Sequence, residues 1–247
     1  MPTVDQLILS KSVPNERIGI TDTNMKTRTT LWIAVLGAVA FTLSACNRYS
    51  AESTEGWVID ADTKKPIEGV IVVAEWQLHK STVGGRIPAD HLNIMETLTD
   101  GNGLYYFERW GPRSAQWGFF IDRDPALLFY KERYKYHSLQ NPLRSEIDNS
   151  KVRRSVWNGK TIELKRFEGD LKDYASHLSF LHTSMRSILY GDKCEWKRIP
   201  KLVLAIAKQE NIFRKNNVYN VLTSLDDISG YKCGSAEEYF KSMQTKN

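Results

Sequence analysis

The stretch TEGWVIDADTKKPIEGVIVVAEWQL, residues 54–78, decides the fold that we expect for this chain. Residues 55–60 form a run of β-favouring side chains, and a polar turn that ends at Pro66 follows it. Residues 67–78 are apolar and rich in β-branched side chains, which predicts a strand that is largely buried. Two strands joined by a short turn, with no helical segment between them, favour a β-sheet protein over an α/β protein.

Short strands continue after this stretch. Residues 95–99 predict a strand, the sequence DGNG at 100–103 predicts a tight turn, and residues 104–110 predict the partner strand of a hairpin. Residues 79–93 are predicted to form a loop. The remaining predicted strands are residues 117–121, 127–136 and 160–166. Short strands separated by turns rather than helices favour a β-sandwich with antiparallel strands.

The same region resembles a known family. The segments GWVIDADT (56–63), PIEGVIVV (66–73) and TLTDGNGLYYF (97–107) resemble the carboxypeptidase regulatory-like family, which combines G-x-V-x-D-x-x-T, P-I-x-G-V-x-V and T-D-x-x-G-x-Y/F-x-F. This resemblance implies a transthyretin-like antiparallel β-sandwich of about seven strands over residues 54–166. The loop at 79–93 and the segment at 138–158 are longer than the family pattern.

The periodicity changes after the predicted sandwich. Apolar residues recur at three- and four-residue steps through 171–189, which predicts an amphipathic helix. Pro200 is expected to open a second helix, and a cap at 234–235 is expected to precede a last helix over 236–243. Residues 167–247 are therefore expected to form a C-terminal helical unit, and the overall class is mainly β plus α.

An apolar segment precedes the sandwich. Residues 31–42 (LWIAVLGAVAFT) form a run shorter than the roughly 20 residues that a membrane-spanning helix needs. Lys26 and Arg28 stand just before the run as a positive n-region. The pattern matches the charged and apolar parts of a signal peptide.

A lipobox-like motif follows the apolar run. Leu43, Ser44, Ala45 and Cys46 resemble the lipobox of bacterial lipoproteins. The resemblance implies attachment of a lipid to the Cys46 thiol and cleavage after Ala45. Asn47 in place of an Asp favours sorting to the outer membrane, with the protein facing the periplasm. An ordinary signal peptide or an uncleaved anchor is the alternative.

The resemblance also divides the N-terminal region. Met25 begins the sequence MKTR, a natural signal-peptide start, so we interpret residues 1–24 as a start-codon extension. A genuine long n-region is the alternative. Residues 25–45 are then the signal peptide, and the polar residues 46–53 are the tether between the lipid and the fold.

The chain has three cysteines. If Cys46 carries the lipid, Cys194 and Cys233 remain, and an oxidising periplasm permits a disulfide bond between them. Such a bond would pin the helical unit together. Two buried free thiols are the alternative.

The sequence contains no recognised catalytic motif. The serine-hydrolase pattern G-x-S-x-G and the paired histidines of H-E-x-x-H are both absent. His79 and His91 share the predicted loop with Asp90, where a metal or acid–base role is the alternative to ordinary hydrogen-bonded histidines. We predict no metal site, no cofactor and no enzymatic activity.

Composition limits the partners. The 247 residues include 26% charged and 41% hydrophobic side chains, which argues against global disorder. The net charge of +5 is mild for this length and does not indicate nucleic acid. Outward-facing members of the seven tryptophans would offer stacking surfaces for sugar rings.

We therefore expect an envelope lipoprotein anchored in the membrane through Cys46. Its non-catalytic sandwich would act as a binding, accessory or structural module for an envelope protein, cell-wall or glycan partner. An enzyme or inhibitor with a site between the sandwich and the helices is the alternative.

Overall fold

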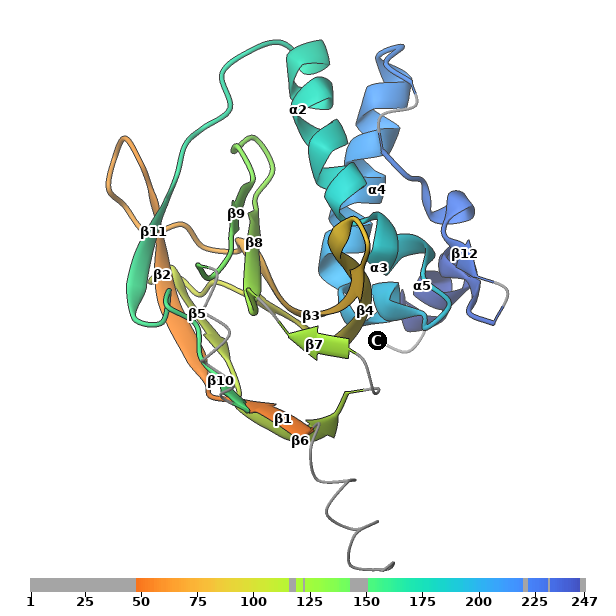
Figure 1. The fold of residues 1–247 in the computed structure, drawn as a ribbon. Coiled ribbons are helices and arrows are strands. Elements are labelled where there is room, and N and C mark those ends of the chain that lie inside the picture. Colours follow the sequence, from red (N-terminus) through yellow and green to blue (C-terminus); the bar gives the residue numbers. More distant parts are fainter. Residues whose placement is uncertain are drawn as a thin grey trace, which may run out of the picture. The chain divides into compact units, whose positions relative to one another are not determined.

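The computed structural model describes residues 48–115, 119–121, 123–142, 151–219, 222–230 and 232–244. Its strands are β1 (Arg48–Ala51), β2 (Thr54–Asp60), β3 (Ile71–Thr82), β4 (Gly85–Leu98), β5 (Leu104–Phe107), β6 (Trp110–Ser114), β7 (Phe119–Ile121), β8 (Ala126–Tyr130), β9 (His137–Leu139), β10 (Val152–Arg153), β11 (Lys160–Leu164), β12 (Ser229–Gly230) and β13 (Gly234–Ser235). Its α-helices are α2 (Leu171–Ser184), α3 (Arg186–Tyr190), α4 (Pro200–Lys215) and α5 (Ala236–Gln244), with 3₁₀ turns η1 (Glu195–Arg198) and η2 (Leu225–Asp227). The class is therefore mainly β with C-terminal helices, as the sequence predicts (Figure 1).

Two larger sheets form the β part. One has the strand order β11-β2-β5, and the other has the order β4-β3-β8-β9 with β7 also paired to β3. A third sheet, made of shorter strands, has the order β10-β1-β6, and β12 pairs with β13. The pairs β2–β11 and β1–β10 are parallel, so the prediction of purely antiparallel strands is wrong at these two places. Strands joined in parallel must come from distant parts of the chain, which short local turn signals do not reveal.

The predicted loop at 79–93 is wrong. Those residues instead extend a long β-hairpin, in which β3 and β4 pair from Ile71 and Leu98 out to Thr82 and Gly85. Gly85 has a positive φ of 110°, which glycine adopts without steric cost at the turn. Pro88 misled the prediction, but β4 lies at a sheet edge, where a residue without an amide proton is tolerated.

The turn at 100–103 forms, but not as a hairpin within one sheet. The Asp100 carboxylate accepts hydrogen bonds from the amides of Asn102 and Leu104 at 2.8 and 2.9 Å. The following strand, β5, then pairs with β2 rather than with β4. The turn therefore carries the chain from one sheet to the other. The residues of the turn alone do not distinguish this arrangement from a hairpin.

Strand β3 is buried on both faces because two cores meet at it. Val72, Ala74 and Trp76 belong to the core between the sheets. Ile71 and Val73 belong to a second core, which they share with the helices. Two-sided burial explains why residues 67–78 read as a continuous apolar run.

The helices cover the side of the β3–β4 sheet that faces away from β2, β5 and β11 (Figure 1). Asp170 begins α2 with a capping box that includes Asp173, and Pro200 occupies the first turn of α4 as predicted. The residue before α4 does not cap that helix with its side chain. Glu96 of β4 supplies the cap instead. Its carboxylate accepts the amides of Lys201 and Leu202 at 2.9 and 2.8 Å. The helices are thus joined to the sheet by a shared core and by a carboxylate at a helix N-terminus.

Cys194 and Cys233 form a disulfide bond, with Cα atoms 5.3 Å apart.

Residues 47–247 form one compact unit. Residues 48–51, which we expected in the tether, form β1 instead. The predicted signal peptide and Cys46 lie outside the described residues.

Candidate functional site

A groove lies between the helix-facing side of β3 and β4 and the helical part of the chain. Three cavities of about 470, 670 and 130 Å³ share Gln77 of β3. The second and third are also lined by residues of the helical part, whereas the first is lined by strand and loop residues between positions 75 and 140. Glu75, two residues earlier on the same face, lines the first and third cavities. We call this region the sheet–helix groove. It places polar groups beside an otherwise apolar core.

An irregularity of the hairpin turns His91 into this groove. The register of β3 and β4 shifts between the pairs Trp76–Asn93 and Gln77–His91, which leaves Leu92 as an extra residue on β4. Leu92 packs into the core between the sheets, and the next residue toward the hairpin tip faces the helices. A β-bulge of this kind changes which face a side chain occupies. Strict alternation would have directed His91 into the sandwich core.

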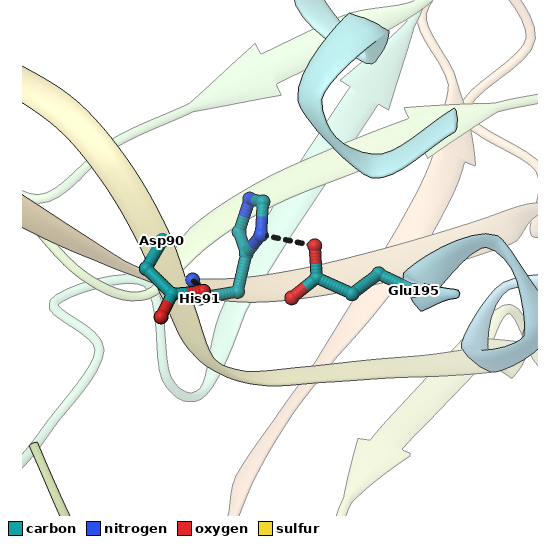
Figure 2. Close-up of side chains that lie close together, drawn as sticks. All are labelled: Asp90, His91 and Glu195. Atoms are coloured by element: carbon teal, nitrogen blue, oxygen red, sulfur yellow. Dashed lines mark hydrogen bonds and ion pairs between the residues drawn. The ribbon is translucent and has the colours of Figure 1, made fainter. Parts of the chain in front are cut away.

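His91 lies between two glutamates. Its Nδ1 is 2.6 Å from Oε2 of Glu195, the first residue of η1, and its Nε2 is 2.7 Å from Oε1 of Glu75. The side chain of His91 is 3% exposed and that of Glu195 is 8% exposed. Figure 2 shows the imidazole ring of His91 directed toward the Glu195 carboxylate. The cluster therefore connects both strands of the hairpin to the helical part.

The electrostatics of His91 follow from this geometry. Burial alone would lower the pKa of the imidazole, but the contacts with Glu195 and Glu75 outweigh burial and raise the pKa to about 9. In the absence of other ligands, the ring is an imidazolium at neutral pH. Both ring nitrogens are engaged by carboxylates, so neither is presented to a substrate as a free base.

Asp90 extends the cluster toward the second cavity. Its Oδ1 accepts the His91 amide at 2.8 Å, and its Oδ2 forms a close ion pair with the Lys193 ammonium. Donor atoms of Asp90, His91 and Glu195 all lie within 4.8 Å of one another. These residues are the candidate ligands for a cation.

The sequence located only part of this site. His79 and His91 both line the groove, but in different cavities, and Asp90 accompanies His91 as the sequence suggested. Glu75 and Glu195 were missed. A single carboxylate within the apolar run VVAEWQL was a usable signal for Glu75, because an isolated charge in a buried strand requires a partner. No local pattern indicated Glu195.

The five tryptophans within the described residues differ in exposure. Trp76 and Trp196 are 1% and 0% exposed, Trp110 and Trp157 are partly buried, and Trp57 on β2 is 37% exposed. Within the described ranges, no helix has the length and apolarity required to cross a membrane.

No protein-family model matches the chain, and a search of curated proteins finds no match. Solved structures show weak similarity. A 3-chlorocatechol 1,2-dioxygenase from Rhodococcus opacus aligns at 14% identity over 50% of this chain and 62% of its own, with a TM-score of 0.25. The backbone protein of the group B streptococcus pilus 2b aligns at 11% identity over 47% of this chain and 41% of its own, with a TM-score of 0.24. The major pilin subunit of Bacillus cereus aligns at 18% identity over 46% and 30%, with a TM-score of 0.17. The chain thus spans less than two thirds of each of these proteins, and we draw no functional conclusion from them.

Proposed function

We propose that this protein is a lipid-anchored envelope lipoprotein whose folded part binds an envelope ligand or partner in the sheet–helix groove without catalysis. The observation that carries the binding function is the groove itself. Its polar residues Glu75, Gln77 and His91 line cavities where the surrounding sheet and helices are otherwise packed. Ligand sites combine a concave surface with a few convergent polar groups, as this groove does.

The sandwich is proposed to be transthyretin-like and related to the carboxypeptidase regulatory-like family. The motif residues support this proposal because each has a local structural role. The carboxylate of Asp60 accepts the amides of Asp62 and Thr63 at 3.1 and 2.9 Å and so forms the first turn. Thr99 bonds to the backbone of Val70 and Ile67. Asp60 therefore shapes the first turn of the motif, and Thr99, the residue after β4, joins the end of that strand to the segment before β3.

The lipid anchor is proposed on the sequence of residues 31–46. Only Asn47 separates Cys46 from β1, which begins at Arg48. A lipid on Cys46 would therefore tether the chain just before the first strand of the folded part. Several acyl chains suffice for durable anchoring. The expected membrane is the outer one, with the protein facing the periplasm.

Metabolic labelling with palmitate tests the anchor. The wild-type chain should be labelled and should sediment with membranes, and Cys46→Ala should lose both properties. The double variant Cys194→Ala/Cys233→Ala is the matched control and should retain the label, since its cysteines lie in the folded part. Labelling that persists in Cys46→Ala would contradict the anchor.

Site-specific photo-cross-linking in intact cells tests the groove. A photoreactive amino acid at Gln77, which lines all three cavities, should form an adduct with the bound molecule. The same amino acid at Thr161, an exposed position on β11 of the other sheet, is the control. Equal adducts at both positions, or none at Gln77, would refute binding in the groove.

The second candidate is an envelope enzyme or inhibitor with its site in the same groove. The observation that favours it is that His91 and Glu75 line cavities between the sheet and the helices, and that His79 lines the cavity that shares Gln77 with them. The adduct at Gln77 distinguishes the candidates. A molecule that the wild-type chain alters chemically, and that Glu195→Gln leaves intact, would indicate an enzyme. An adduct with an envelope enzyme whose activity falls on binding would indicate an inhibitor.

A further inference from the structure

Potential ligand atoms of Asp90, His91 and Glu195 lie close enough together to hold a cation. A divalent ion bound at 2.0–2.2 Å to two protein ligands places the two donor atoms roughly 3.3 Å apart. His91 Nδ1 and Glu195 Oε2 are already 2.6 Å apart, and a carboxylate oxygen of Asp90 lies within 4.8 Å of both. If His91 Nδ1 and Glu195 Oε2 moved apart by less than an ångström and the Asp90 carboxylate rotated toward them, the three residues would form a complete set of three ligands.

Glu75 occupies the position of an orienting carboxylate. Its Oε1 lies 2.7 Å from Nε2 of His91, on the opposite side of the ring from Glu195. A metal-binding imidazole ordinarily donates its second N–H to a carboxylate, which fixes the ring and leaves the other nitrogen for the metal. With Glu75 at ion-pair distance from Nε2, Nδ1 is the ring nitrogen that faces the other candidate ligands.

The charge of the cluster also favours a dication. The carboxylates of Glu75, Asp90 and Glu195 surround His91, and the cationic side chain paired with this group is Lys193. When a cation displaces the proton of the His91 imidazolium, the cluster is left with an excess of two negative charges, which a divalent cation cancels. A buried charge excess is costly, and a bound metal relieves it.

The site is accessible. Asp90, His91, Lys193 and Glu195 line the cavity of about 670 Å³, which includes Gln77 on its β3 side. A cation held by one imidazole nitrogen and two carboxylates would retain at least one coordination position for water or a ligand group. That arrangement is typical of a reactive or ligand-binding metal rather than of a closed structural site.

We propose that Asp90, His91 and Glu195 bind a divalent first-row transition cation such as zinc, with Glu75 as the positioning residue and Lys193 as the competing cation. Mixed imidazole and carboxylate ligands suit zinc, manganese or iron better than calcium or magnesium. The site lies in the groove of the proposed function, but it requires neither the lipid anchor nor an envelope partner.

Calorimetric titration of the purified full-length chain with zinc chloride, after removal of metals by chelation, tests the proposal. The wild-type chain should bind one equivalent with a dissociation constant below about 100 µM. Glu195→Gln and His91→Gln should abolish this binding, and Glu75→Gln should weaken it roughly 10–100-fold. His137→Gln, which replaces an exposed histidine of β9, is the matched control and should change nothing.

A variant that is expected to bind zinc more tightly complements the variants that lose binding, because a chain that fails to fold would not gain affinity. The Lys193 side chain is 62% exposed, so Lys193→Ala should fold normally. Its removal releases Asp90 and eliminates a nearby positive charge, and zinc should bind about tenfold more tightly. Cobalt(II) added to the wild-type chain should give d–d absorption without thiolate charge-transfer bands.

Three results would overturn the site. They are the absence of zinc binding by the wild-type chain at 100 µM, an affinity that Lys193→Ala leaves unchanged or weakens, and binding that His137→Gln removes. Each is independent of palmitate labelling and of cross-linking at Gln77, so this inference and the proposed function fail separately.

Discussion

Removal of the disulfide bond should cost about 4 kcal/mol of the free energy of unfolding. Cys194 and Cys233 are 39 residues apart, and a loop of this length loses that much conformational entropy in the unfolded chain under the chain-entropy model. Cys194 directly precedes Glu195, so the bond also restrains the residue that contacts His91. The loss should therefore be measurable both in global stability and in the groove.

The assay is urea denaturation of Cys194→Ala/Cys233→Ala, compared with the parent chain in a Cys46→Ala background that carries no lipid. Tryptophan fluorescence reports the transition, because Trp196 is buried against α5, 5.2 Å from the ring of Tyr239. The parent chain in excess reductant is the control, and its unfolding curve should coincide with that of the variant. A difference below about 1 kcal/mol between oxidised parent and variant would refute the loop-entropy reasoning.

Further variants test other buried features by the same denaturation assay. Arg153 pairs with Asp124 through three bonds of 2.7–3.1 Å, so Arg153→Met should cost about 3–5 kcal/mol, and the added change Asp124→Leu should recover part of that loss. Gly103 has a φ of 73° and a Cβ there would lie 2.4 Å from a backbone oxygen, so Gly103→Ala should cost at least about 2 kcal/mol, whereas Gly101→Ala, with open space around it, should cost under about 1 kcal/mol. Hydrogen bonds from a backbone amide and a tyrosine hydroxyl lower the pKa of Asp60, so its stabilisation is complete above its ordinary pKa and is lost as pH falls through the folded-state value. The urea midpoint should thus decline as the pH falls below about 5, and Asp60→Asn should show a smaller decline. Equal losses in the two glycine variants, an undiminished loss in the double variant, or identical pH profiles would contradict the respective argument.

Local sequence patterns predicted the helices, because the buried face of a helix follows from its own periodicity. The helix at 171–189 was read from its period, and Tyr174, Leu178 and Leu181 are buried as that period requires, although the chain divides there into α2 and α3. Pro200 opened α4 as expected. These features depend on neighbours along the chain, which the sequence displays directly.

The candidate site depends on features that have no local signal. One extra residue on β4 decides that His91 faces the helices, and neither Leu92 nor its neighbours mark a bulge. Glu195 reaches His91 from 104 residues away. Glu96 caps a helix that begins more than 100 residues later. Such contacts arise from how the sheet and helices pack, so a single sequence does not reveal them.

The position of β2 has a consequence for incomplete chains. β2 is central in its sheet, with β5 on one side and β11 on the other, and Gly56 pairs with Lys160. A chain cut or stalled before residue 160 therefore leaves one edge of β2 without a partner. Unpaired strand edges invite association between molecules, so such fragments should aggregate rather than accumulate as soluble domains.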